Sequence, residues 1–449
     1  MALGGGTWIF QNKVLPGAYI NFKSQVTATT DIVDRGYGAM PIELDWGPEN
    51  EVFSVEAEDF QKNSMKIFGY DYTNDNLIGL RDLFKNLKTG YFYRLSNGAT
   101  KATGSTGTAK YSGIRGNDIT VVVSANIDET DKFDVTTYVD VDGVKTIVDE
   151  QTVANATDLE DNDYVVFTKT GDLTANAGDK YTGGTNGEAV TALQHQNFLS
   201  AIEPYYFNTL GVVTSEKTIK DLYISFVKRM RDDVGMKFQL VLYDAKADYE
   251  GVISIKNKVK DSGVSPASLV YWVVGAEASC AVNASCTNKT YDGEFDIDVK
   301  LSQTELKKAI NDGYLTLHRV TDPTSGDVVG NINVLTDINS FTSFTKTKNS
   351  DFAKNQVIRV LDQVAIDVAR LFNKTYLGKE QNDDDGRVAF WSDLVAYYNE
   401  LQQVRAIQNF SSSDLPVPSQ GTDKTAVVTE HVIQPTCCME KLYMTVNVA

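Results

Sequence analysis

Residues 209–255 read TLGVVTSEKTIKDLYISFVKRMRDDVGMKFQLVLYDAKADYEGVISI. Two apolar runs, Thr209 to Val213 and Lys237 to Tyr243, flank a segment at 217–233 whose apolar residues recur with helical spacing. A third apolar run, Val252 to Ile255, comes next. Short apolar strands that alternate with helices predict a largely parallel sheet covered by helices, because two parallel strands must be joined by a long crossover.

The same alternation extends in both directions along the chain. Further helices are predicted at 77–87, 188–203, 266–279 and 302–312, and further strands at Val14 to Phe22, Gly38 to Asp45, Tyr91 to Leu95 and Tyr314 to Val320. The helix at 302–312 begins with the capping-box pattern Ser302-Gln303-Thr304-Glu305, and Gly313 follows it as a typical C-cap. The predicted fold class is therefore an α/β core, built from residues 24–95 and 187–335.

Residues 96–186 differ from this core in composition. They contain no Pro, Met, Cys or Trp, and they carry 7 basic and 15 acidic side chains. Runs such as Asp118 to Val123 and Asp134 to Val139 have β-type composition, and the second is followed by Asp142-Gly143, a two-residue hairpin signal. We therefore predict an inserted antiparallel β-sandwich domain at 96–186, with its acidic surface facing solvent.

The last third of the chain is predicted to form a helical domain at 336–423. One helix, at 355–373, carries Val357, Leu361, Val364, Val368 and Leu371 on one face; a second, at 388–409, carries Trp391, Leu394, Tyr398, Leu401 and Val404. Two amphipathic helices joined by a short turn predict a helical hairpin packed on the core. The turn, Asp383-Asp384-Asp385-Gly386, lacks the ligand spacing of a calcium loop, so a solvated acidic loop is favoured over a calcium site.

Both ends of the chain carry predicted strands, an N-terminal arm at 1–23 and a C-terminal arm at 424–449. The residues expected to form the arm strands are Val14, Ala18, Ile20, Phe22, Val427, Val428, Val432, Ile433, Leu442, Met444, Val446 and Val448. Apolar and polar side chains alternate from Leu442 to Val448, and no turn returns this run to the fold. A strand with unpaired edges can pair within its own subunit or extend the sheet of a neighbour. Spacing alone leaves both interpretations open.

Charge and hydropathy argue against several classes of partner. The net charge is −18, from 42 basic and 60 acidic side chains, and such a field repels nucleic acid. No apolar run reaches the roughly 18 residues of a membrane helix, so membrane insertion is not expected. The N-terminus lacks the basic and apolar parts of an export signal, so the protein is expected to stay in the cytoplasm where it is made.

The sequence predicts no enzyme site, cofactor or metal. Its candidate nucleophiles, bases and ligands include three histidines (His195, His318 and His431) and four cysteines (Cys280, Cys286, Cys437 and Cys438). None of the histidines lies in a recognisable catalytic motif, and the cysteines lack zinc-ligand spacing, so free thiols are favoured. The sequence disfavours two other classes of protein. Scarce histidine argues against a hydrolase, and the missing export signal argues against a cell-surface or adhesin-like protein whose β-insertion binds carbohydrate.

Three stretches resemble a known family. They are Leu15-Pro16-Gly17-Ala18-Tyr19-Ile20-Asn21-Phe22, the region from Arg35-Gly36 through Ala39-Met40-Pro41-Ile42 to Trp46-Gly47-Pro48, and the closing run from Val432-Ile433-Gln434-Pro435 through Met439 to Val446. On these patterns the chain resembles the contractile tail sheath proteins of myophages and phage-tail-like particles, above all the sheaths of Gram-positive prophages and R-type bacteriocins. The resemblance covers essentially the whole chain, with its segments in the same order.

The resemblance implies a mechanical function. Subunits would form hexameric rings stacked around a tail tube, with terminal arms paired to the sheets of neighbours, and contraction would drive the tube through the target envelope. It implies a subtilisin-like α/β domain, although no protease triad is found at recognisable motifs. The expected partners are further copies of the chain, the tail tube protein, and the baseplate and tail terminator proteins. Assembly is expected in the bacterial host cytoplasm, as part of a virion tail or tail-like particle.

The resemblance also suggests an orientation of the subunit. The helical domain would face the tube and the acidic insertion would point outward. Candidate cationic tube contacts are Lys354, Arg359, Arg370, Lys374, Arg387 and Arg405, for which ordinary helix-surface charge is the competing interpretation. Gly4-Gly5-Gly6 and Ser411 to Gly421 are the expected hinges between the arms and the body.

Overall fold

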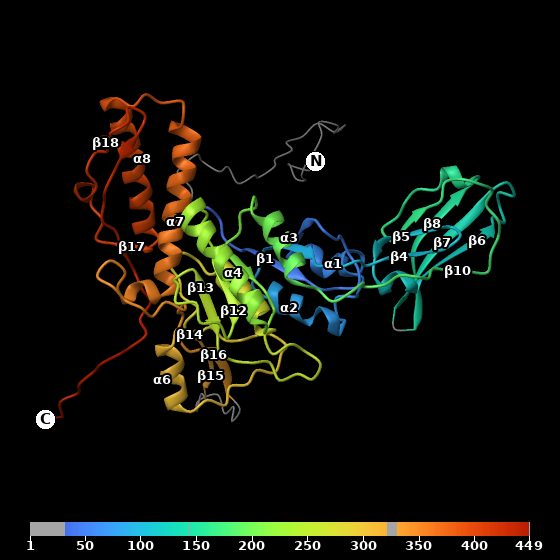
Figure 1. Cartoon of the computed structure of the whole chain (residues 1–449), viewed down its shortest axis with the longest axis horizontal. Coiled ribbons are helices and arrows are strands. Elements are labelled where there is room, and N and C mark those ends of the chain that lie inside the picture. The colour runs from blue at the N-terminus through green and yellow to red at the C-terminus, as the bar shows by residue number, and fades with distance from the viewer. Residues whose placement is uncertain (1–31, 142, 321–329, 449) are drawn as a thin grey trace, which may run out of the picture.

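A computed structural model describes residues 32–141, 143–320 and 330–448. The β-rich segment lies at one end of the elongated molecule, the α/β core lies in the middle, and two long helices stand at the other end (Figure 1). The predicted strand at Val14 to Phe22, with Val14, Ala18, Ile20 and Phe22, and the predicted hinge at 4–6 lie outside the described residues.

The central sheet has seven strands. In spatial order they are β14 (Tyr314–Leu315), β13 (Val252–Ile255), β12 (Gln239–Tyr243), β11 (Thr209–Gly211), β1 (Tyr37–Ile42), β3 (Thr89–Arg94) and β2 (Val52–Glu56). Neighbouring strands are parallel, except that β2 pairs antiparallel with β3. The prediction of a largely parallel sheet is therefore confirmed, and the sheet joins chain from both sides of the insertion.

Helices cover both faces of this sheet. They are α1 (Ala57–Phe68), α2 (Ile78–Phe84), α3 (Ala192–Ile202), α4 (Lys217–Arg229) and α5 (Leu269–Ser279), whereas α6 (Gln303–Asn311) lies beside the edge strand β14. Along β1, Met40 packs in one hydrophobic cluster with Trp272 of α5, and the preceding Ala39 packs in another with Tyr223 of α4. Successive residues of a strand point to opposite faces, so the two clusters are the two sides of one sheet. This double burial explains why the strands read as continuous apolar runs.

One local prediction was wrong, and two elements were not predicted. The predicted strand at Tyr314 to Val320 is divided into β14 and β15 (Leu317–Val320), and β15 pairs antiparallel with β16 (Asn331–Val334) in a separate sheet. The division has a side-chain cause: the Asn257 amide accepts from Leu317 N at 2.7 Å and donates to Leu317 O at 2.9 Å, which replaces the next strand partner. The sequence also missed β2 and α1, which follow one another without a turn.

Residues 96–186 form two antiparallel sheets of their own. One contains β10 (Asp179–Lys180), β6 (Ile119–Ala125), β7 (Phe133–Val141) and β8 (Val144–Val153); the other contains β4 (Lys101–Thr103), β5 (Gly107–Ser112) and β9 (Val165–Phe167). The predicted hairpin joins β7 to β8, with Gly143 at φ +84°. Trp46 of the α/β core is buried against this domain, with its ring 5.8 Å from that of Tyr164. The predicted β-sandwich is confirmed.

The C-terminal third contains the predicted pair of long helices. They are α7 (Asn355–Leu371), which continues into a π-helical turn at Phe372–Tyr376, and α8 (Asp384–Gln403). The acidic turn is a helix cap, because Asp383 accepts a hydrogen bond from Gly386 N. Leu394, Tyr398 and Leu401 of the predicted stripe on α8 are buried in the domain core. Within the described ranges, no helix has both the length and the apolar character needed to cross a membrane.

Candidate interaction site at the C-terminal arm

After α8 the chain extends along the helical domain and then returns along the same path. Four short strands mark this path, β17 (Ile407–Gln408), β18 (Ser419–Gln420), β19 (Val427–Val428) and β20 (Gln434–Pro435). β18 pairs with β19, and β17 pairs with β20. Val427 and Val428 therefore pair within their own chain rather than belonging to a free strand, and Ile433 packs against the domain core.

The segment predicted as a hinge, Ser411 to Gly421, is held on the body. Leu415 is buried, and its carbonyl accepts a 2.6 Å hydrogen bond from Trp391 Nε1. Ser411 and Asp414 cap each other around a short 3-10 turn. The predicted boundary of the C-terminal arm at residue 424 is therefore too early, because tertiary contacts that spacing does not reveal hold residues 424–440 to the fold.

The chain leaves the body after Glu440. Upstream, Thr436 N donates to Ala406 O, and Cys438 N donates to Gln356 Oε1 at 2.9 Å. The Glu440 carboxylate then accepts from Lys354 Nζ at 2.5 Å, from Thr287 Oγ1 at 2.8 Å and from Thr336 Oγ1 at 3.2 Å. Beyond this point the trace extends away from the molecule (Figure 1).

Residues 441–448, the free end of the arm, have no strand partner within the described chain. Its apolar side chains Leu442, Tyr443, Met444, Val446 and Val448 are 69–93% exposed. Val432, nearer the body, is also exposed. In an extended segment of this kind the backbone N–H and C=O groups have no strand partner, and the apolar side chains are exposed to water. Both features favour pairing with another chain.

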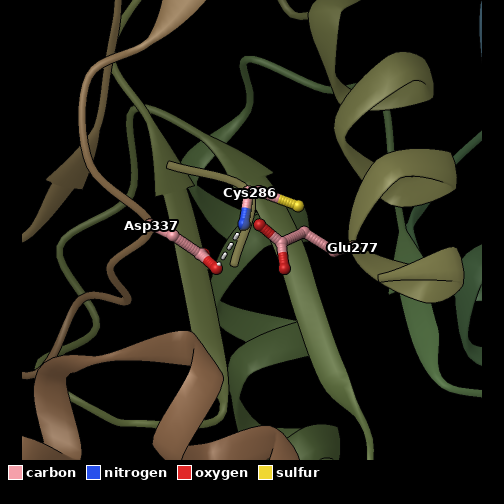
Figure 2. A group of neighbouring side chains, drawn as sticks. All are labelled: Glu277, Cys286 and Asp337. Atoms are coloured by element: carbon pink, nitrogen blue, oxygen red, sulfur yellow. Dashed lines mark hydrogen bonds between the residues drawn. The ribbon is translucent and has the colours of Figure 1, made fainter. Parts of the chain in front are cut away.

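A second notable site is a buried charge cluster between α5 and α7. Arg359 Nη2 lies 2.6 Å from Glu277 Oε2 and 3.4 Å from Asp337 Oδ2, and each of these side chains is about 1% exposed. Cys286 N donates to Asp337 at 2.9 Å, and Glu277 projects from α5 toward the same point (Figure 2). Burial opposes ionisation of Asp337, but Arg359 and these hydrogen bonds hold its pKa below the usual value. Burial and the nearby Asp337 charge raise the pKa of Glu277.

The cluster has the ligand types of a metal site but is already neutralised. One ligand atom each from Glu277, Cys286 and Asp337 lies within 4.8 Å of the others. The Arg359 guanidinium contacts both carboxyl groups, so it supplies the positive charge that a cation would otherwise bring. We therefore interpret the cluster as a tie between the α/β core and α7. Sequence reasoning missed it, because its members are spread over residues 277–359 and only the tertiary structure brings them together.

A second ion pair supports the same connection. Arg231, in the π-helical turn Met230–Val234 that follows α4, contacts Asp362 of α7 through two hydrogen bonds of 2.6 and 2.7 Å, and both side chains are about nine-tenths buried. Helix α7 is therefore buried mainly on a polar face. Of the apolar stripe predicted for it, Val357 is buried, whereas Val364, Val368 and Leu371 are only half-buried against the core of the helical domain.

The predicted tube contacts occupy three kinds of environment. Arg359 is buried in the cluster and is not available to a partner, so this prediction is wrong. Lys354 is engaged by Glu440, and Arg387 is largely buried beside Asp384. Arg370, Lys374 and Arg405 are exposed, so these three remain candidate contacts.

Two of the three histidines, His195 and His431, occupy packing positions. His195 is buried with Nδ1 3.0 Å from the Tyr223 hydroxyl, and burial lowers its pKa to about 4. His431 Nε2 lies 2.5 Å from the Tyr398 hydroxyl, which fixes the returning chain to α8. These contacts are those of structural side chains.

Comparison with known proteins shows which family has this architecture. Four family models match in sequence: the tail sheath protein Gp18 domain III N-terminal region at 35–95, the phage tail sheath β-sandwich domain at 96–186, the central domain at 188–334 and the C-terminal domain at 347–449. The phage-like element PBSX protein XkdK of Bacillus subtilis is 31% identical over 481 aligned positions, which cover 99% of this chain and 100% of that protein. The chain belongs to the phage tail sheath protein family.

Solved structures agree with this assignment. The sheath tail protein of Desulfitobacterium hafniense is 38% identical and superposes with a TM-score of 0.78, covering 93% of this sheath subunit and 96% of that chain. The contracted helical sheath of the anti-feeding prophage shares the fold at 11% identity, with a TM-score of 0.54 over 97% of this subunit and 99% of that chain. The protein is thus a structural component of a contractile phage tail or tail-like particle.

Proposed function

We propose that this sheath subunit polymerises as stacked hexameric rings around a tail tube, and that contraction of the polymer drives the tube through the envelope of a target cell. The observation that carries the proposal is the free end at 441–448. It has alternating apolar residues and no strand partner within the described chain. A continuous polymer needs such a segment, because main-chain pairing keeps subunits connected while their bodies reorient.

The free end would add to a sheet of a neighbouring subunit. The β18–β19 pair is a suitable receiver, because an isolated two-stranded sheet is only marginally stable and gains from a third strand. A hollow of about 440 Å³ lies beside it, lined by Val427, Phe372, Tyr376 and Phe390 among others. Apolar side chains of an added strand could enter this hollow. The N-terminal arm, with Val14, Ala18, Ile20 and Phe22, would pair in the same way.

The remaining partners follow from the expected orientation of the subunit. The helical domain would face the tube protein with Arg370, Lys374 and Arg405, whose exposed charges permit such contacts. The baseplate and terminator proteins would meet the two ends of the polymer, and the acidic β-sandwich would point outward. Assembly would take place in the bacterial host cytoplasm, and the α/β domain would be subtilisin-like in fold without acting as a protease.

Negative-stain electron microscopy of the purified protein tests the proposal. At rising concentration, sheath subunits are expected to form hollow tubes with sixfold symmetry in cross-section. A preparation that stays monomeric at high protein concentration, by both microscopy and light scattering, would contradict it.

A further inference from the structure

The last contact between the arm and the body is a built site rather than a chance ion pair. The Glu440 carboxylate accepts hydrogen bonds from three segments that are distant in sequence, through Thr287, Thr336 and Lys354. Thr287 follows α5, Thr336 follows β16, and Lys354 precedes the first turn of α7. The side chains of Glu440 and Lys354 are 21% and 33% exposed, so this ion pair is less screened by water than a fully exposed one.

The three donors are themselves fixed in place. Thr287 Oγ1 accepts a 2.9 Å hydrogen bond from Asp337 N and lies 3.1 Å from Ser285 Oγ. Lys354 Nζ also donates to Thr336 Oγ1 at 3.3 Å. Asp337 belongs to the buried cluster with Arg359, so the site that receives Glu440 is continuous with the tie between the α/β core and α7. A pre-positioned set of donors holds a carboxylate at a smaller entropic cost than mobile side chains do.

We propose that Glu440 is the anchor about which the C-terminal arm turns, and that it transfers tension from the arm to the junction of the α/β core and helix α7. The inference rests on the proposed polymerisation and names the residue that positions the arm for it. Residues before Glu440 keep their contacts with the body, whereas residues 441–448 are free to change direction. The swivel therefore lies between Glu440 and Lys441, and the segment Ser411 to Gly421 stays folded while the arm moves.

The experiment compares Glu440→Gln with the wild-type full chain and with Glu430→Gln. Glu430 is an exposed glutamate on the returning segment, ten residues before Glu440, and provides a matched control. We expect E440Q to raise the concentration needed for half-maximal tube formation about tenfold, because a charge-assisted contact is replaced by a neutral one. The melting temperature of its unassembled subunit should match that of E430Q.

A second measurement tests the anchor without polymerisation. Hydrogen exchange of the unassembled subunit should become about tenfold faster at Cys438 N in E440Q, because the neighbouring Gln356 contact loses its downstream support. The charge swap K354E with E440K should restore part of the slow exchange and of the assembly, because it remakes the ion pair but not the hydrogen bonds that Thr287 and Thr336 donate to the carboxylate. Unchanged exchange and assembly in E440Q, or equal losses in E430Q, would overturn the inference. Failure of the wild-type protein to form tubes would instead contradict the proposed function.

Discussion

Arg359 lies on α7 with its guanidinium between two carboxyl groups in the protein interior. An arginine charge on the surface contributes little to stability. In the interior, the charge of Arg359 compensates buried carboxyl groups and therefore has a large effect on stability. Removing one member of a buried ion cluster leaves the others charged and without water. The free-energy penalty for this is larger than the stabilisation that the intact cluster provides.

We therefore predict that Arg359→Met lowers the free energy of unfolding by about 3–5 kcal/mol. The reason is that Asp337 would stay buried without its counter-charge. Arg370→Met, on the exposed side of the same helix, is the control and should change stability by less than about 0.5 kcal/mol. Urea unfolding followed by circular dichroism gives both values. Similar effects of the two substitutions would refute the structural role of the cluster.

His195 gives the subunit a defined dependence of stability on pH. Its pKa is lowered to about 4 by burial, against about 6.5 in an unfolded chain. Below pH 6.5 the unfolded state therefore binds a proton that the folded state does not, so the contribution of His195 to stability is complete above pH 6.5 and is lost as the pH falls toward 4. His195→Asn, whose amide can still hydrogen-bond to the Tyr223 hydroxyl, should be less sensitive to this change.

The measurement is urea unfolding of both proteins at pH 7 and pH 5. Asp82, whose pKa is raised to about 6 by burial, shifts stability the opposite way in this range, and taking the difference between the two proteins cancels it. An equal loss of stability in wild type and H195N would contradict the assignment.

At the level of elements, the C-terminal arm consists of two parts with different functions. Residues 424–440 belong to the fold through β19, β20 and the contact between His431 and Tyr398. The free end at 441–448 has exposed side chains and no strand partner in the described chain. The two parts should respond differently to truncation.

Deletion of 441–449 should leave the melting temperature unchanged and abolish tube formation, because it removes an unpartnered strand from an intact body. Deletion of 425–449 should also lower the melting temperature by several degrees, because it uncovers part of the core of the helical domain. Differential scanning fluorimetry and electron microscopy separate the two effects. Normal tubes from the shorter deletion would rule out assembly through the free end.

For the whole molecule, the β-sandwich is an appendage with its own core. Asn97 and Gly187, where the insertion leaves and rejoins the α/β core, are paired by a β-bridge, so a short linker can join them. Trp46 is the large side chain that excision would expose.

Replacement of 98–186 by a Gly-Ser linker, combined with Trp46→Gln, should therefore give a folded subunit that still forms tubes. The same excision with Trp46 retained should aggregate more, because a large apolar surface becomes exposed. Light scattering and microscopy of the two proteins check this. Loss of folding in both would show that the insertion is required by the core.

The sequence predicted the structure best where the burial of side chains follows a regular pattern along the chain. Continuous apolar runs predicted β11, β12 and β13, because a strand covered on both faces cannot alternate with polar residues. Turn chemistry predicted the β7–β8 hairpin and the capped helix α6. Prediction failed where one side chain decides the structure, as at Asn257, which ends the parallel pairing near residue 316.

The sequence by itself determined the order of the segments, the α/β character of the core, the all-β insertion, the helical hairpin and the alternating pattern of the free end. Each of these depends on local composition, on turn residues or on short-range periodicity, and the periodicity is set by backbone geometry. Only the tertiary structure decided that Arg359 is buried and that the arm leaves the body at Glu440 rather than near Ser411. Both depend on contacts between segments about twenty to more than 150 residues apart, for which local spacing carries no signal.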